Sequence, residues 1–412
     1  MRRIAQAATL SLTDLRRDFS VSASVAGLIA VIVAYGGPAA IIFQAATKAG
    51  LTSGQLTSWI WAISIGSGLA GLALSLRYRV PVIIAWSTPG AALLAAGWAA
   101  YPYPDAIGAF LLAGIAITIF GATGLFSALM ERIPQAVVAA MLAGILFRFG
   151  VEVFTALRGA PMLVAPMLVC YLAMKRLKPR YAIVATLCAG LAASAALGLL
   201  HLGGLDATLA RPEFTAPHFS LGALIGLGVP LFMVTMTGQN ATGLGVLRTA
   251  GYKTPGGPLV AATGALSTLL APFGAHGINL AAITAAICTG PEAHTDPDRR
   301  YVAGVVCGLA YLVVGLFGAT LVGIFAALPA PLVAAISGLA LFGALMAGLT
   351  QAMHDEPKRE AALVTFLITV SGVTLWGVGS AFWGLVGGVL ANAALSVRRG
   401  GAGDVASGGQ GA

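Results

Sequence analysis

Long apolar runs separated by short polar stretches extend through almost the whole chain of 412 residues. A helix needs about 20 mainly apolar residues to cross the hydrocarbon core of a bilayer, and these runs have that length. They lack the alternating pattern of outer-membrane strands. The pattern predicts fourteen membrane segments, at residues 22–47, 53–76, 81–98, 105–130, 134–155, 160–175, 180–201, 220–248, 257–271, 273–290, 300–327, 329–350, 359–376 and 378–397.

The two halves of the chain resemble each other. IPQAVVAAMLAGILF at 133–147 matches LPAPLVAAISGLALF at 328–342, and PVIIAWSTPGAALLAAG at 81–97 corresponds to APFGAHGINLAAITAA at 271–286. Each half holds seven segments, so the second half enters the membrane from the opposite side. The predicted fold is therefore an all-α polytopic membrane protein built as a 7+7 inverted repeat, the usual architecture of secondary transporters.

The third and tenth segments are interrupted at equivalent places. In the third, PVIIAW has the composition of a strand, Ser87 or Thr88 can cap a helix, and Pro89 suits its first turn. In the tenth, APFGA is expected to be extended or irregular, and a short helix is expected to begin near His276–Asn279. Each segment is thus predicted to be a short strand followed by a half helix.

Two half helices that begin near the middle of the membrane would form an anion site. Their free N–H groups and positive dipole ends favour an anionic ligand. Irregular backbone at this depth is tolerated only where protein or a water-filled cavity covers it. A proline kink satisfied by neighbouring helices is the alternative, and two breaks at repeat-equivalent positions favour the binding site.

Composition and charge support a membrane protein. Hydrophobic residues make up 58% and charged residues 9% of the chain, against about 25% charged residues in soluble proteins; the mean hydropathy is +0.92. The net charge of +9 comes from basic residues between apolar runs, where they set topology, so no nucleic-acid partner is expected. No cysteine pattern indicates a metal, no cofactor is expected, and no catalytic motif is present, so the protein is not expected to be an enzyme.

The distribution of Lys and Arg predicts the orientation. With the N-terminus in the cytoplasm, 19 of the 23 basic residues lie on the cytoplasmic side, Lys48, Arg158 and Arg211 lie opposite, and Arg148 falls within a segment. Both termini are therefore expected on the cytoplasmic side of the inner membrane. Residues 1–20 are expected to form a cytoplasmic segment and residues 399–412 a disordered tail.

Further polar residues lie in or near the interrupted segments. Tyr35 lies in AYGGPAA, and Gln239 and Asn240 lie in TMTGQNATGLG; both stretches predict polar breaks. Such residues are costly in lipid unless they face a cavity or another helix. His276 is the one histidine inside a membrane break; it can exchange a proton near neutral pH or contact a ligand without titrating.

The acidic residues are informative by their absence from the centre of the predicted site. Glu152 follows Arg148 by four positions, which predicts an ion pair on one helix face, with a structural role favoured over a gate. Because no carboxylate lies in the predicted site, an anionic substrate would meet no repulsion there.

The motifs AWSTPGAAL, GQN at 238–240 and FGAHGINLAAIT resemble the benzoate:proton symporter family (BenE), which is related to nucleobase/ascorbate and sulfate-type anion transporters. The resemblance covers about residues 15–398. It implies substrate between the half helices and a core domain that moves against a gate domain, an elevator-type alternating access. The implied domains are core at 21–132 and 204–327 and gate at 133–203 and 328–398.

One departure from the nucleobase relatives indicates the substrate. They carry Gly-Glu-Asn where this chain has Gly277-Ile278-Asn279, and an apolar residue there suits an aromatic carboxylate. The prediction is import of benzoate or a similar aromatic carboxylate with a proton; the alternative is an anion exchanger or channel. The proton carrier is left open between His276 and the carboxylate, and the assembly between monomer and homodimer. The predicted substrate-binding residues are Tyr35, Ser87, Thr88, Gly90, Gln239, Asn240, His276, Gly277 and Asn279.

Overall fold

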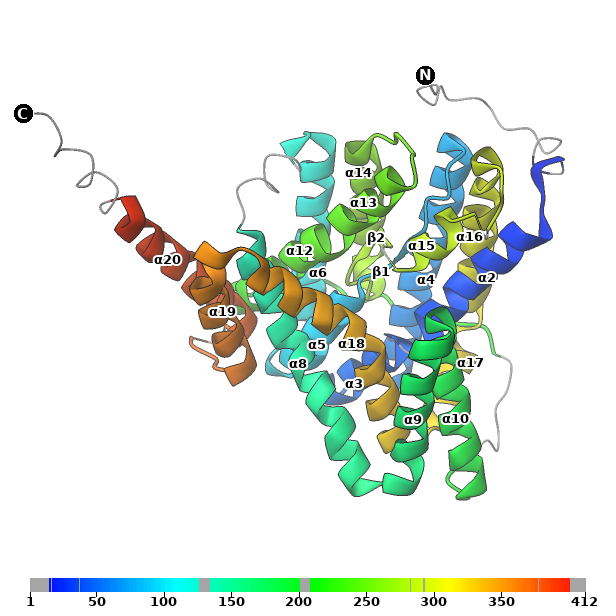
Figure 1. The fold of residues 1–412 in the computed structure, drawn as a ribbon, viewed down its shortest axis with the longest axis horizontal. Helices are drawn as coiled ribbons and strands as arrows, with labels where there is room; N and C mark the ends of the chain where they lie inside the picture. Colours follow the sequence, from blue (N-terminus) through cyan, green and yellow to red (C-terminus); the bar gives the residue numbers. More distant parts are fainter. Residues whose placement is uncertain are drawn as a thin grey trace, which may run out of the picture.

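The computed structural model describes residues 15, 17–36, 38–125, 134–200, 208–281, 283–291, 293–376 and 378–400, and these form a helical protein (Figure 1). The larger helices of the first half are α2 (Val21–Gly36), α3 (Pro38–Ala49), α4 (Ser53–Tyr78), α5 (Thr88–Gly97), α6 (Tyr103–Ala122), α8 (Gln135–Gly159), α9 (Pro161–Leu177) and α10 (Ala182–Ala196). The α-helices of the second half, short ones included, are α11 (Leu221–Ala223), α12 (Val229–Val234), α13 (Thr242–Thr249), α14 (Gly256–Leu270), α15 (Ile283–Thr289), α16 (Tyr301–Leu316), α17 (Gly318–Ala326), α18 (Ala330–His354), α19 (Arg359–Ser371) and α20 (Ser380–Gly400).

Within the described part of the chain, eight helical stretches are long and apolar enough to cross a membrane. They are Val21–Ala49, Ser53–Tyr78, Tyr103–Ala122, Gln135–Gly159, Leu221–Thr249, Gly256–Phe273, Pro297–Leu316 and Ala330–His354. This confirms the predicted all-α polytopic class. Each of the fourteen predicted segments overlaps a helix, a run of helices or a strand–helix pair. Most of the expected cytoplasmic segment 1–20 and of the tail 399–412 lies outside the described residues.

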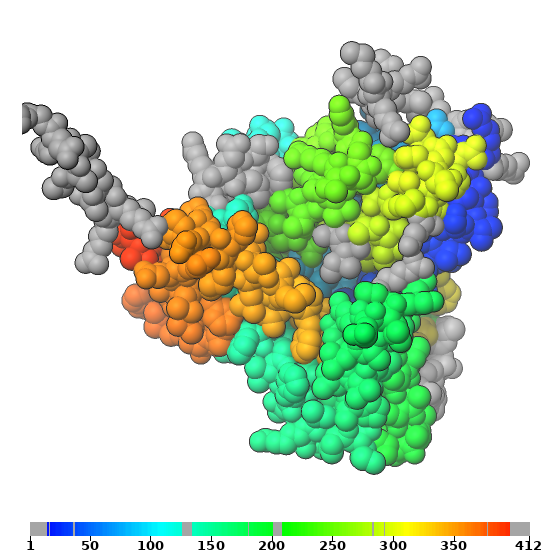
Figure 2. All heavy atoms as spheres, viewed as in Figure 1, coloured from blue at the N-terminus to red at the C-terminus, as the bar shows by residue number. Residues whose placement is uncertain are grey.

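The helices pack as two groups. In one, α4 and α2 pack against α16, and α6 packs against α14; in the other, α8 packs against α18 and α19, α19 against α20, and α9 against α10. Figure 1 shows α9 and α10 at the lower end, α19 and α20 at one edge, and the two strands near the centre. In Figure 2 the second group forms a continuous surface from the left edge to the bottom of the molecule.

Two helix pairs of the first group approach closely because glycines face each other's backbone. A Cβ on Gly68 of α4 would lie 2.8 Å from the carbonyl oxygen of Gly308 in α16, and one on Gly308 would lie 2.9 Å from that of Gly68. The α6–α14 pair repeats the arrangement, since a Cβ on Gly114 would lie 2.8 Å from Thr268 N. Small residues allow such close packing of membrane helices.

Two short strands pair with each other at the centre of the molecule. β1 (Ile84–Trp86) pairs antiparallel with β2 (Ile278–Leu280), and Ala85 faces Asn279. All six strand residues are buried. Backbone hydrogen bonds from Ser87 N to Gly277 O (3.0 Å) and from Ala281 N to Ile83 O (2.9 Å) extend the pairing at each end. The strand–half helix form predicted for both interrupted segments is confirmed.

The predicted start of the second half helix is wrong. α15 begins at Ile283, whereas residues near 276–279 were expected to begin it. The backbone from Gly277 to Ala281 bonds to β1 instead and is held extended. Gly277 therefore lies beside the start of α5, at the other end of the strand pair from the start of α15.

Two polar breaks were predicted, near Tyr35 and around Gln239. The first falls at Gly37, which lies outside the described residues; α2 and α3 lie on either side of it within the apolar stretch Val21–Ala49. The stretch around Gln239 stays helical: Leu221–Thr249 is a continuous helical run that contains π-helical turns at Leu224–Gly228 and Thr235–Ala241. A π turn widens the helix and is frequent at functional sites, so the polar sequence changes the helix type there rather than ending the helix.

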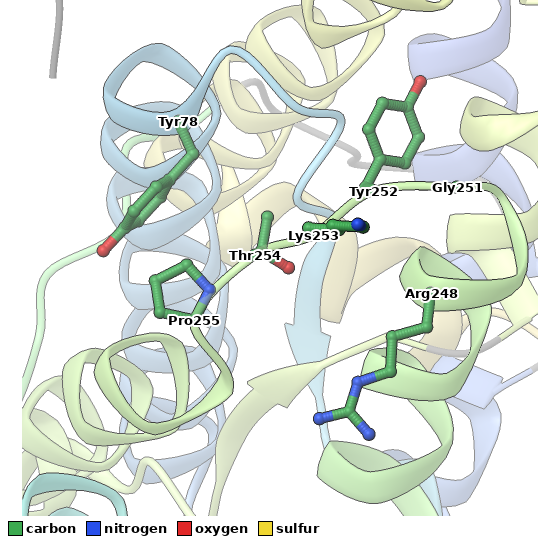
Figure 3. Close-up of a pocket in the computed structure, with 7 residues that line it drawn as sticks. All are labelled: Tyr78, Arg248, Gly251, Tyr252, Lys253, Thr254 and Pro255. Atoms are coloured by element: carbon green, nitrogen blue, oxygen red, sulfur yellow. The ribbon is translucent and has the colours of Figure 1, made fainter. Parts of the chain in front are cut away.

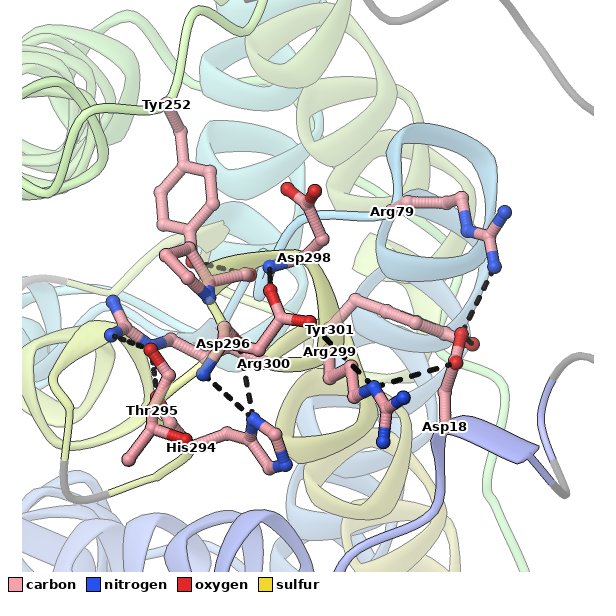
Figure 4. Close-up of polar contacts among 11 residues, drawn as sticks. Asp18, Arg79, Tyr252, His294, Thr295, Asp296, Asp298, Arg299, Arg300 and Tyr301 are labelled. Carbon is pink, nitrogen blue, oxygen red and sulfur yellow. Dashed lines mark hydrogen bonds and ion pairs between the residues drawn. The ribbon is translucent and has the colours of Figure 1, made fainter.

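Polar contacts fix the ends of several helices (Figure 4). The buried carboxylate of Asp18 accepts hydrogen bonds from Arg79 Nη2 and Tyr301 Oη, both at 3.0 Å. Arg300 donates through Nη1 to the carbonyl of Thr289, the last residue of α15, at 2.7 Å. A cation at this position complements the negative end of the half-helix dipole.

Candidate functional site

Ser87 joins the three elements that meet at the start of α5. Its Oγ accepts hydrogen bonds from Gly90 N (3.1 Å) and from Thr235 Oγ1 (3.2 Å) in the π-helical turn. Its carbonyl oxygen lies 2.9 Å from His276 Nε2. Ser87 is completely buried, so its polar groups are used within the protein. The residue caps α5 and holds it against the two neighbouring chain segments.

His276 is buried and bonded through both ring nitrogens. Trp59 Nε1 donates to His276 Nδ1 at 2.9 Å. An indole nitrogen is only a donor, so Nδ1 carries no proton, and the Nε2 proton is donated to the carbonyl of Ser87. The rings of Trp59, Trp86 and Phe110 surround the imidazole at centroid distances of 5.4, 6.2 and 6.3 Å. A second proton on His276 would require the bond to Trp59 to break.

Two buried amides hold the second strand. Asn240 Oδ1 accepts from Leu280 N at 3.1 Å, which satisfies a backbone donor of β2. With its amide oxygen turned toward Ser87, Asn279 accepts from Ser87 N and donates to Leu280 O, both at 3.1 Å. Both side chains are completely buried. Asn240 thus gives the Leu280 N–H a partner in the membrane interior, and Asn279 adds a second acceptor for Ser87 N, which also donates to Gly277 O.

Thr88 and Gln239 differ from their neighbours because both are only partly buried. In the described part of the chain, neither side chain makes a hydrogen bond. Thr88 is the first residue of α5, and Gln239 lies in the π-helical turn. A Cβ on the adjacent Gly238 would lie 3.7 Å from Leu142 of α8 and 4.0 Å from Pro89, so the turn, the start of α5 and α8 meet here.

The start of α5 offers one backbone donor to a ligand. Pro89 has no N–H, Gly90 N donates to Ser87 Oγ, and Ala91 N donates to Ser87 O. Of the first four residues of α5, Thr88 keeps an N–H without a described partner, at the positive end of the helix dipole. Gly90, one of the predicted substrate-binding residues, therefore uses its N–H within the cap.

Tyr35 contacts Trp86, whose ring also contacts His276. Its hydroxyl is 2.5 Å from Ser64 Oγ, and its ring packs on Trp86 and Tyr311 at centroid distances of 6.3 and 5.7 Å. The indole N–H of Trp86 and the hydroxyl of Tyr311 are buried with no hydrogen-bond partner among the described residues. Tyr35 is therefore part of a packed aromatic cluster rather than of the group around Thr88.

Sequence reasoning missed Trp59 and Thr235, which bind His276 and Ser87. No local signal marks Trp59, which is recognisable only through its contact with a residue far away in the chain. Thr235 opens the polar stretch TMTGQNATGLG, but its contact with Ser87 is likewise a long-range one. Trp86 lies inside the motif AWSTPG, so the sequence alone could have added it to the predicted site residues. In the part of the chain that the structure describes, no group of three or more His, Cys, Asp or Glu residues is placed to hold a metal.

The predicted pair of Arg148 with Glu152 is not present. Glu152 Oε1 lies 3.3 Å from Lys48 Nζ of α3, and Gln44 of α3 donates to the other carboxylate oxygen. Arg148 donates instead to the carbonyl of Val370 in α19 at 3.1 Å. The i,i+4 spacing put both residues on one helix, but partners on other helices compete for both.

A surface hollow of about 630 Å³ contains none of the predicted site residues (Figure 3). It lies between the end of α4 and the connection from α13 to α14. It is lined by Tyr78, Arg248, Gly251, Tyr252, Lys253, Thr254 and Pro255.

Comparisons with known proteins agree on one family. The profile of the family described as "Benzoate membrane transport protein" matches residues 17–394. The chain is 44% identical over 383 residues to the "Benzoate membrane transport protein" of Acinetobacter baylyi, covering 93% of this chain and 97% of that protein. It is 45% identical over 363 residues to "Inner membrane protein YdcO" of Escherichia coli, covering 88% and 93%.

Solved structures share the fold at low sequence identity. The transmembrane domain of the cyanobacterial bicarbonate transporter BicA aligns with a TM-score of 0.57 and 17% identity, over 90% of this chain and 97% of that one. The murine anion transporter Slc26a9 in its inward-facing state aligns with a TM-score of 0.61 and 13% identity, over 97% and 74%.

Proposed function

The chain belongs to the benzoate membrane transport protein family, and from this premise we propose that it imports benzoate or a similar aromatic carboxylate together with a proton. This is a family of transporters and not of enzymes. The inner membrane is the proposed location, supported by the name of the Escherichia coli relative and by the apolar helices. The charge bias supports cytoplasmic termini.

The proposed architecture is a 7+7 inverted repeat of fourteen segments, with core at 21–132 and 204–327 and gate at 133–203 and 328–398. Its support is that helix contacts occur in equivalent pairs. The contact of α4 with α16 corresponds to that of α14 with α6, and the contact of α9 with α10 to that of α19 with α20. The contact of α8 with α18 joins equivalent helices of the two halves.

The substrate carboxylate is proposed to bind at the start of α5. The single observation that carries this is the pair of partly buried, unbonded side chains of Thr88 and Gln239 beside the positive end of a half helix. The Thr88 N–H, the Thr88 hydroxyl and the Gln239 amide are three donor groups for a carboxylate. Leu142 and Pro89 supply an apolar wall for the ring.

The other predicted site residues are proposed to position this site. Ser87, Gly90 and Gly277 form the cap and its backbone partner, and Asn240 and Asn279 hold β2. Tyr35 packs against the ring of Trp86. His276 fixes the start of α5 to the aromatic cluster around Trp59.

The proton is proposed to travel on the substrate carboxylate. An inside-negative potential opposes entry of an anion by about 2.3 kcal/mol per charge per 100 mV, and one proton makes the step electroneutral. His276 already uses both ring nitrogens. A carboxylate enclosed without a full counter-charge gains more from protonation, because burial disfavours the charged form.

An anion exchanger or channel is the second candidate, favoured by the structural similarity to bicarbonate and Slc26a9 anion transporters. Saturable uptake of radiolabelled benzoate into proteoliposomes distinguishes the two. Protein-free liposomes are the control, because neutral benzoic acid crosses bilayers unaided. The proposal expects an inward proton gradient to increase the saturable part. Uptake that ignores the gradient and needs an internal anion would establish exchange instead.

A further inference from the structure

A polar cluster joins α3 to α8, and hence one group of helices to the other. Glu152 of α8 lies 3.3 Å from Lys48 Nζ through Oε1 and accepts a hydrogen bond from Gln44 through Oε2. Both of these partners are on α3. The core and gate domains of the proposed function thus contact each other through a carboxylate with two partners.

The positions of its residues place this cluster on one side of the membrane. Lys48 lies in the last turn of α3, and Glu152 lies in the last third of α8. Lys48 and Arg158, which follows Glu152 on α8, belong to the few basic residues on the side opposite to most of the charge. The cluster therefore lies on the outer side of the molecule.

A second contact joins the same two domains. The hydroxyl of Tyr101, which precedes α6, receives a backbone hydrogen bond from Gly379, which precedes α20. Gly226 packs against both, since a Cβ there would lie 2.1 Å from the Tyr101 hydroxyl and 3.4 Å from Gly379 N. In the proposed topology Tyr101 also lies on the outer side, so two contacts hold the core domain against the gate domain there.

We propose that Glu152, Lys48 and Gln44 form an outer gate. Their contact closes the external route to Thr88 and Gln239 in this conformation, and it breaks when the core domain moves against the gate domain. The inference rests on the proposed transport function. The exposed fractions of the Lys48 and Glu152 side chains are 44% and 33%. A pair this exposed is weak and screened by salt, as suits a contact that breaks in every transport cycle.

The test measures access to the site from outside. Leu142→Cys places a thiol on α8 beside Gly238, and Cys170→Ala and Cys188→Ala remove the less buried native thiols; Cys288 and Cys307 are buried. A membrane-impermeant maleimide is added outside to cells that carry this protein. Glu152→Gln is expected to raise the labelling rate about twofold to fivefold, the range that an exposed ion pair contributes.

Charge exchange separates a gate from a folding defect. Lys48→Glu and Glu152→Lys are each expected to speed labelling, and the double exchange to restore the slow rate. Asp355→Asn is the matched control, because it removes a 2.5 Å ion pair with Lys358 within the gate domain and should leave the rate unchanged. Unchanged labelling in Glu152→Gln, or a double exchange no slower than the single variants, would overturn the gate.

Labelling does not depend on benzoate, so the two proposals fail separately. Wild-type uptake driven by a proton gradient together with unaltered labelling in Glu152→Gln removes the gate and leaves the transport function. Faster labelling in Glu152→Gln without any saturable benzoate uptake by the wild type removes the substrate assignment and leaves the gate.

Discussion

The imidazole of His276 donates from Nε2 to the carbonyl oxygen of Ser87 at 2.9 Å, and the two residues belong to opposite halves of the chain. Because Trp59 occupies the other nitrogen, this bond fixes both the ring and its tautomer. His276 therefore connects the start of α5 to the residues that lead into β2. Its geometry is that of a positioning residue for the site at Thr88.

Replacing His276 tests that role. His276→Ala leaves the Trp59 N–H unpaired and buried, which costs about 1–3 kcal/mol. It also removes one of the two donors to the Ser87 carbonyl, which keeps its bond from Ala91 N. We expect benzoate exchange and proton-driven accumulation to fall by the same factor, measured in proteoliposomes with equal amounts of protein. A selective loss of accumulation, with exchange retained, would identify His276 as the proton carrier.

Thr88→Val tests the hydroxyl at the start of α5. Valine keeps the shape and the backbone N–H but removes a donor whose partner, in the proposed site, is a carboxylate. A hydrogen bond to a charged group contributes about 1.5–3 kcal/mol, so benzoate should bind at least about tenfold more weakly. Isothermal titration of purified protein measures this. Thr88→Ser is the matched control and should bind nearly as the wild type does; equal affinity of the valine variant would exclude the hydroxyl.

Gly308→Ala tests the contact of α4 with α16. The added methyl would lie 2.8 Å from Leu72 N and 2.9 Å from Gly68 O, which is too close for either backbone to accept. Overpacking of this kind costs about 1–3 kcal/mol, so the melting temperature in detergent should fall. Gly245→Ala is the control, because a Cβ there has no neighbour within 4 Å and alanine favours a helix. A variant at Gly308 as stable as the one at Gly245 would contradict the close packing.

Local sequence predicted the first interrupted segment because its signals are local. Ser87 caps α5 through Gly90 N, and Pro89 stands in the first turn, where its missing N–H is tolerated. For the second interrupted segment the predicted helix start was wrong, because β2 is held extended by pairing with β1, almost 200 residues earlier in the chain. Asn279 is of a type that caps helices, but its side chain bonds to Ser87 N and Leu280 O instead.

Long-range contacts also explain the remaining differences. Arg148 and Glu152 have the spacing of a helical pair, yet each binds a residue on another helix. The polar stretch around Gln239 was expected to break the helix, but the π-helical turn accommodates it and places Asn240 against Leu280 N. Spacing along one helix identifies residues on a shared face, whereas the choice of partner depends on the neighbouring helices.

Gln239→Glu tests the electrostatics of the proposed site. The substitution keeps the shape of the side chain but adds a negative charge beside the substrate carboxylate. Two like charges about 4 Å apart repel by about 4 kcal/mol at an effective dielectric constant of 20, so benzoate affinity near neutral pH should fall on the order of a hundredfold or more. As pH falls and the introduced carboxyl is protonated, it again resembles the glutamine amide, and the ratio of wild-type to variant affinity should approach one. Titrations of both proteins across a pH series measure this ratio. A constant ratio would mean that Gln239 lies away from the carboxylate, whereas convergence at low pH would place the substrate charge beside the π-helical turn.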